Sequence, residues 1–239
     1  FLNSFNSGRL PHAWLLCGPR GIGKATFAHR IARFVLMHGG SVDEGPGLFG
    51  DDLPQTDPTS LATDIENSVC RRMIAGGHAD FLHIQRSIDE KTGKRRIEIT
   101  VNEVRSVGSF LSMTPAEGGW RVIIIDSADE MNANAANAVL KVLEEPPKRA
   151  LILLVSHNPG RLLPTIRSRC RRLLLKSLSD RTISDLLSQY DPEMIPEDAA
   201  ELANIADGSI GRALDLSSEG GLEIYREING ILATLPQLD

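Results

Sequence analysis

Strand-sized apolar runs alternate with amphipathic helical patterns through the first part of the chain. The apolar runs lie at residues 13–17, 81–85, 121–126, 150–157 and 170–175. The helical patterns, with apolar residues three or four positions apart, lie at residues 25–38, 65–77, 101–114 and 133–145. Because several runs carry apolar residues on both faces, they predict buried strands of a parallel sheet that is covered on both sides.

Two shorter patterns complete this region. Residues 97–100, IEIT, predict a second short strand after the run at 81–85, and the charged stretch at 87–96 predicts an exposed basic turn. After Lys176 only helical patterns remain, separated by Gly or Pro. The chain is therefore predicted to form an α/β domain over residues 1–177 and a small all-helical domain over 178–239.

The segment at residues 39–64 has a different character, since it is rich in Gly, Pro and Asp and shows no periodicity. Between Phe34 and Cys70 there is no Lys or Arg, whereas seven acidic residues occur. The segment therefore predicts an acidic insertion, packed at most through Leu48, Phe49 and Leu53. Without those seven charges the net charge changes from −5 to +2, so any contact with nucleic acid is expected to be local.

Composition narrows the class of protein further. The chain is 41% hydrophobic and 24% charged, as in ordinary folded proteins, and no apolar run approaches the roughly 20 residues that span a bilayer. We expect no membrane contact and a cytoplasmic location. Three widely separated cysteines fit a reducing compartment, and their spacing predicts no metal site.

A glycine-rich loop follows the first apolar run. The sequence GPRGIGKA places Gly18, Gly21, Gly23 and Lys24 in the G-x-x-x-x-G-K pattern, between a predicted strand and a predicted helix. The glycines allow backbone amides to surround phosphate oxygens, and the lysine can neutralise their charge. The pattern predicts a P-loop, and a plain glycine turn is the alternative.

Two positions that ATP hydrolysis needs are altered. The loop ends in Ala25, where a Ser or Thr hydroxyl would bind Mg²⁺, and Thr26 lies about 100° further around the helix. The run at 121–126 ends in Asp126, but the next residue is Ser127 in place of a water-polarising acid. The carboxylates at 129 and 130 are expected to cap or solvate the following helix. Phosphate binding without hydrolysis is therefore predicted.

Arg169 is the candidate for chemistry on another molecule. In TIRSRC it precedes the last apolar run, where an arginine can reach an anion on a neighbouring protein. Judged alone, an ordinary surface arginine is the favoured interpretation, because four other arginines lie nearby.

Four segments together resemble the bacterial DNA polymerase III delta prime subunits, which are AAA+ clamp-loader components. They are GPRGIGKAT, IIIDSADEMNANAANAVLKVLEEPP, VSHNPGRLLPTIRSRC and DGSIGRAL. The resemblance spans nearly the whole chain and implies an AAA+ domain followed by a helical lid. It also implies that Arg169 is a trans-acting arginine finger, with Ser156, His157 and Arg212 at the sensor positions. The four-cysteine zinc module of many such subunits is reduced here to Cys70, and we do not expect their C-terminal collar domain within these 239 residues.

The resemblance implies a subunit of the DNA polymerase III holoenzyme that lacks ATPase and polymerase activity of its own. Its partners would be the gamma/tau motor and delta subunits, the sliding clamp, and primer-template DNA through the assembled complex. No cofactor is expected to be required, and ATP, ADP or phosphate would bind weakly at the P-loop. Two alternatives are an active AAA+ motor, of a clamp loader or a branch-migration helicase, and a regulatory nucleotide-binding module.

Overall fold

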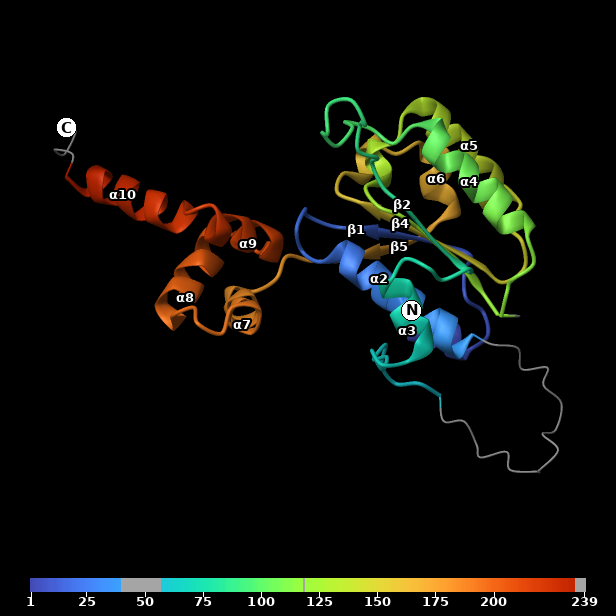
Figure 1. Ribbon diagram of the computed structural model, residues 1–239, viewed down its shortest axis with the longest axis horizontal. Coiled ribbons are helices and arrows are strands. Elements are labelled where there is room, and N and C mark those ends of the chain that lie inside the picture. The colour runs from blue at the N-terminus through green and yellow to red at the C-terminus, as the bar shows by residue number, and fades with distance from the viewer. Residues whose placement is uncertain (40–56, 118, 235–239) are drawn as a thin grey trace. The chain divides into compact units, whose positions relative to one another are not determined.

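A computed structural model describes residues 1–39, 57–117 and 119–234, which belong to two compact units (Figure 1). The first unit contains Phe1–Cys17 and the described residues of Ala25–Leu174. The second contains Gly18–Lys24 and the described residues from Leu175 onward, so the glycine-rich loop groups with the C-terminal helices. Most of the acidic segment predicted at 39–64, including Leu48, Phe49 and Leu53, lies outside the described residues.

A five-stranded parallel sheet forms the centre of the first unit. Its strands are β1 (Ala13–Cys17), β2 (Phe81–Ile84), β3 (Arg121–Ile125), β4 (Ala150–Ser156) and β5 (Arg171–Leu174), in the order β2-β3-β4-β1-β5. The three central strands are buried at every position, in keeping with sequences that are apolar except for Arg121 and Ser156. The predicted parallel sheet is confirmed.

Helices cover the two faces of this sheet. In Figure 1, α2 (Lys24–His38) and α3 (Ser68–Ile74) lie on one side, and α4 (Val101–Ser112) and α5 (Ala133–Glu144) lie on the other. The unit also contains α1 (Leu2–Asn6), α6 (Pro164–Arg169) and 3-10 turns at Ala128–Glu130 and Pro159–Arg161. The apolar faces of α4 and α5 pack against the strands, with Val107 and Val139 almost fully buried beside Ile123.

Two strand predictions need correction. Residues 97–100 form no strand, because Ile99 makes only an isolated bridge to Met131 and α4 begins directly afterwards at Val101. The strand at the end of the unit is real but is not buried. β5 is an edge strand with β1 as its neighbour, so Arg171, Arg172 and Leu174 are exposed.

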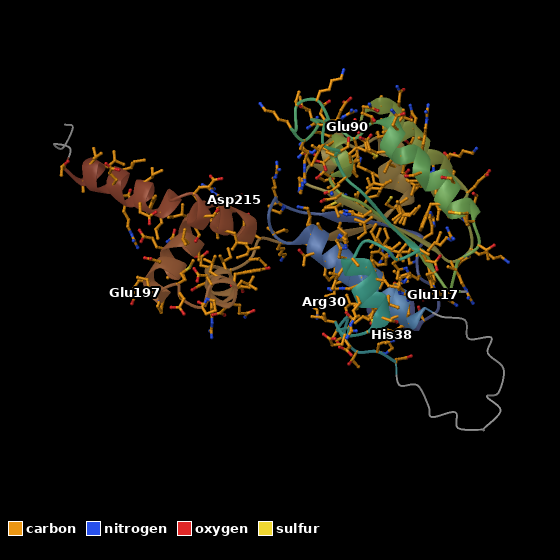
Figure 2. All side chains as sticks on the ribbon, in the orientation of Figure 1. Arg30, His38, Glu90, Glu117, Glu197 and Asp215 are labelled. Atoms are coloured by element: carbon orange, nitrogen blue, oxygen red, sulfur yellow. The ribbon has the colours of Figure 1, made fainter. Side chains whose placement is uncertain are left out.

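The basic turn at residues 87–96 is exposed as predicted. Its ends meet through a bridge between Ile88 and Arg95, and Figure 2 shows Glu90 on this turn, away from the sheet. The turn is tied to α4 because Ser87 Oγ donates to a Glu103 carboxylate oxygen at 2.5 Å. Partial burial opposes ionisation of Glu103, yet hydrogen bonds from Ser87 and Thr100 outweigh it and lower its pKa to about 2.

The second unit contains four further helices, α7 (Asp180–Tyr190), α8 (Pro196–Ile205), α9 (Ile210–Ser218) and α10 (Gly221–Ala233). Their core includes Ile183, Leu187 and Leu202, each at most 1% exposed. Arg226 joins α10 to α8 by donating to Asp198 at 2.5 Å and to Glu201 at 2.6 Å. Within residues 1–39, 57–117 and 119–234, no helix is long and apolar enough to cross a membrane.

Candidate functional site

The glycine-rich loop has the backbone conformation that its sequence predicts. Gly18, Gly21 and Gly23 have φ values of +152°, +75° and +87°, which side chains with a Cβ rarely adopt. These turns carry the chain from the end of β1 into α2, whose first residue is Lys24. The predicted strand, loop and helix are therefore present.

Lys24 turns back onto this loop. Its side chain is buried, with 3% of the residue exposed, and its ammonium donates to Gly18 O at 2.8 Å and to Pro19 O. A buried ammonium needs such acceptors, because desolvation without hydrogen bonds is costly. A phosphate group at this loop would have to compete with the two carbonyl groups for the lysine.

The start of α9 contacts the same loop inside the second unit. Gly211 N donates to Gly21 O at 2.9 Å, and Ser209 caps α9 by accepting a hydrogen bond from Arg212 N at 3.1 Å. A Cβ atom on Gly21 would overlap Ser209 Oγ. The structure thus brings the loop next to the helix start that carries Arg212, and the Arg212 side chain is exposed.

The contact between the loop and α9 predicts a specific effect of Gly21→Ala. We expect this substitution to destabilise the second unit by about 2 kcal/mol, because a positive φ is unfavourable with a Cβ and the added atom overlaps Ser209. Hydrogen exchange of the α7–α9 amides would measure the loss. Gly23→Ala is the matched control, since its φ is also positive but its Cβ would meet no atom within 4 Å. Equal losses in the two variants would contradict a role for the contact.

At the end of β3, in the first unit, the backbone bends sharply. Asp126 N donates to Ile84 O at 2.8 Å, and the next residue, Ser127, has φ +60°. The Ser127 hydroxyl lies 3.2 Å from His157 Nε2, so it joins the end of β3 to the residue after β4. The position of the expected water-polarising acid is therefore taken by a hydroxyl that is paired with the predicted sensor residue.

Asp129 reinforces this junction, and its predicted role as a helix cap is wrong. Its buried carboxylate accepts hydrogen bonds from His157 N and Asn158 N, each at 3.0 Å. Burial opposes ionisation of Asp129, but these backbone donors outweigh it and lower the pKa of the carboxyl group. The cap of α5 is Asn132 instead, whose side chain accepts from Ala135 N at 3.0 Å.

Glu130 does not cap α5 either, because it forms an ion pair with Arg86 at 2.8 Å.

Two histidines lie near Asp126. The rings of His29 on α2 and His83 on β2 are 4.8 Å apart, and burial lowers the pKa of both, with the Asp126 charge acting in the opposite direction. Both imidazoles are therefore expected to be neutral near pH 7.

The residue types at these positions do not fit a hydrolytic magnesium centre. Ala25 has no oxygen ligand, Thr26 is exposed, and the Ser127 hydroxyl is engaged with His157. Among the described residues, no group of three or more His, Cys, Asp or Glu side chains could hold a metal ion. All three cysteines are buried thiols, and burial raises the pKa of Cys170 to about 12.

Arg169 is the last residue of α6. One guanidinium nitrogen, Nη2, lies 2.8 Å from Glu144 Oε1 of α5, and Nη1 donates to Thr165 O at 3.0 Å. The Arg169 side chain is 36% exposed and that of Glu144 is 49% exposed. The nearby Arg171 and Arg172 form no ion pair with any described residue. Arg169 thus differs from its neighbours, since it is held in a defined position.

Sequence reasoning did not find two of these features. The bond from Asp129 to the amides after β4 depends on the neighbouring strand, and the pairing of Glu144 with Arg169 depends on how α5 and α6 pack. No local pattern signals either contact. By contrast, the loop glycines and Lys24 are predicted from their spacing, and Arg212 is predicted from the resemblance.

A five-stranded parallel sheet with a glycine-rich loop after its first strand, followed by a helical unit, is the fold of AAA+ proteins. A point mutant of RuvB from Thermotoga maritima has the same fold, with a TM-score of 0.51 and 15% identity, covering 97% of this chain and 60% of that one. The family model for "DNA polymerase III, delta subunit" matches residues 51–179, more than half of the chain.

Curated relatives agree with the family model. The chain is 33% identical to DNA polymerase III subunit delta' of Pseudomonas aeruginosa, covering 95% of this chain and 62% of the relative. Identity to the Bacillus subtilis delta' subunit is also 33%, with 90% and 56% covered. The Escherichia coli tau subunit is 28% identical, with 98% of this chain and 33% of that protein covered. The chain therefore belongs to the DNA polymerase III delta' subunit family, and it spans about three fifths of these delta' relatives.

Proposed function

We propose that this protein is a clamp-loader subunit that does not hydrolyse ATP and that supplies Arg169 to a neighbouring motor subunit. Family membership supports the clamp-loader role. One observation carries the non-hydrolysing part: the residue after Asp126 is Ser127, whose hydroxyl is paired with His157 at 3.2 Å. A serine in that position is no general base for the attacking water, so turnover at this chain's own P-loop is disfavoured.

Arg169 would then act on a nucleotide held by another chain. Its guanidinium lies at the end of α6 with about a third of its surface exposed, and it is permanently charged. Placed against the γ-phosphate of ATP on a gamma/tau motor, it would stabilise the charge of the transition state. The delta subunit, the sliding clamp and primer-template DNA would be the other partners, in the cytoplasm of a bacterium. Any ATP, ADP or phosphate at Gly18, Gly23 and Lys24 would bind weakly.

An active motor is the second candidate function. The complete set of loop glycines, Lys24 at the start of α2, and Asp126 after the end of β3 favour it. Identity to the E. coli tau subunit is also close to the identity with delta' subunits. The absence of a hydroxyl at Ala25 argues against this candidate, because the metal ligand of such motors is missing.

An ATPase assay distinguishes the two candidates. We expect the purified protein with Mg-ATP to show no turnover above that of a Lys24→Ala variant, and calorimetric titration with ATP to show weak binding that does not depend on Mg²⁺. A rate near 1 per second or more, about that of ordinary enzymes, would favour the motor and contradict the proposal. Co-purification with the gamma/tau and delta subunits tests the clamp-loader role separately.

A further inference from the structure

The ion pair between Glu144 and Arg169 is selective within a strongly basic part of the chain. Between Glu130 and Asp180 the sequence contains nine Lys and Arg residues and only two acidic ones, Glu144 and Glu145. Of the two, Glu144 forms an ion pair, and its partner is Arg169 rather than any of the other eight basic residues. Glu145, at the end of α5, forms no ion pair with any residue that the structure describes.

The same contacts fix the direction of the Arg169 side chain. Nη1 donates to Thr165 O, one helical turn earlier, so the side chain lies back along α6. Nη2 is 2.8 Å from Glu144 on the neighbouring helix α5. Both ends of the guanidinium are thus committed within this chain. An anion on another molecule can use the donor face of this arginine fully only after one of these acceptors is displaced.

We propose that Glu144 is a positioning residue that keeps Arg169 folded along α6 until a phosphate group of a nucleotide on another subunit displaces the Glu144 carboxylate. This inference rests on the proposed function, because it requires Arg169 to bind a nucleotide phosphate of another subunit in the assembled loader. A triphosphate carries more negative charge than one carboxylate, so the exchange favours the phosphate once it is near. Because the pair is partly exposed, its restraint is small and readily reversed.

The exchange of Glu144 for a phosphate predicts that a substitution at Glu144 changes the apparent affinity of this chain for the loader but leaves the maximal ATPase rate unchanged. In a loader reconstituted with gamma/tau and delta subunits, Glu144→Gln should lower the concentration of this chain that gives half-maximal DNA-stimulated ATPase by about twofold to fivefold, the range expected for an exposed ion pair. The maximal rate should stay unchanged, because Arg169 meets the phosphate in both proteins. Glu145→Gln is the matched control and should leave both values unchanged.

Combining the substitutions separates this inference from the proposed function. In an Arg169→Ala background, Glu144→Gln should have no further effect, because its only expected action is through Arg169. If Arg169→Ala by itself leaves the ATPase unchanged, the proposed function is overturned. If Arg169→Ala lowers the ATPase but Glu144→Gln leaves the half-maximal concentration at the wild-type value or raises it, only the inference is overturned.

A measurement on the isolated full chain tests the restraint without any partner. Nitrogen NMR of the Arg169 guanidinium should show hindered rotation of its Nη groups in the wild-type protein and faster averaging in Glu144→Gln. Glu145→Gln should retain the wild-type behaviour. Equal averaging rates in the wild-type protein and in Glu144→Gln would overturn the inference, whatever the loader assay shows.

Discussion

A reconstituted loader that contains Arg169→Ala should hydrolyse ATP about 10³-fold more slowly at the motor site that receives this arginine, the lower end of the range for arginine fingers. The guanidinium would supply fixed positive charge where the γ-phosphate develops negative charge, and alanine removes that charge completely. Clamp loading on primer-template DNA should slow in parallel. The measurements are DNA- and clamp-stimulated ATPase and the rate of clamp loading. Only the motor site next to this chain would lose the arginine, so the total ATPase rate should fall by a smaller factor than the rate at that site.

The basic surroundings of Arg169 provide the controls. Arg171→Ala and Arg172→Ala remove exposed charges on β5 that have no ion-pair partner among the described residues, and they should change both rates little. Arg169→Lys keeps the charge but loses the planar guanidinium with its paired N–H donors, so we expect only part of the wild-type ATPase and clamp-loading rates. Thermal unfolding should be nearly unaffected by Arg169→Ala. Wild-type rates in the Arg169→Ala loader would show that this arginine is a surface residue.

The central fold was predictable because its signals are local. The runs at 13–17, 122–125 and 150–155 are apolar at every position, and only a strand buried on both faces accommodates such a sequence between helices. The loop glycines were predictable for a similar reason, since their positive φ values follow from the turn that joins a strand to a helix. In these segments the sequence alone carries the physical constraint.

The incorrect predictions share a different cause. Residues 97–100 have strand-like composition, but they do not pair with a strand. Ile99 N donates to Glu130 O and Ile99 O accepts from Asn132 N, just before the start of α4. The last strand is apolar enough to suggest burial, yet its exposure depends on lying at the sheet edge beside β1. Whether a strand is central or at an edge depends on the order of all five strands, which no single segment encodes.

In the candidate site, too, some residues are predictable from the sequence and their long-range contacts are not. Gly18, Gly23, Lys24 and Asp126 are recognised from spacing, whereas the acceptors that hold Lys24 depend on the folded loop. Residue spacing also cannot show that Glu144 selects Arg169 among nine basic neighbours, because the pair joins two helices whose packing is set by the core. Long-range polar contacts of this kind account for what the sequence could not reveal.

Asp129→Ala should destabilise the first unit by about 3 kcal/mol, the largest stability loss that we predict. The substitution removes the buried carboxylate that accepts hydrogen bonds from the amides of His157 and Asn158, and a hydrogen bond to a charged group contributes about 1.5–3 kcal/mol. Both tryptophans, Trp14 and Trp120, lie in this unit, so denaturant unfolding followed by their fluorescence reports on it. Glu90→Ala, on the exposed turn in Figure 2, is the control and should change stability by less than about 0.5 kcal/mol.

The dependence on pH tests the same contact through its charge. Because the pKa of Asp129 is lower in the folded protein than its ordinary value of 3.8, the carboxylate stabilises the fold fully above that value. Its contribution is lost as the pH falls through the folded-state pKa. Asp129→Asn keeps the shape of the side chain but cannot ionise, so its stability deficit should be full at pH 7 and shrink below about pH 4. A deficit that stays constant from pH 7 to pH 3 would contradict an ionised Asp129 and leave only its packing to explain the loss.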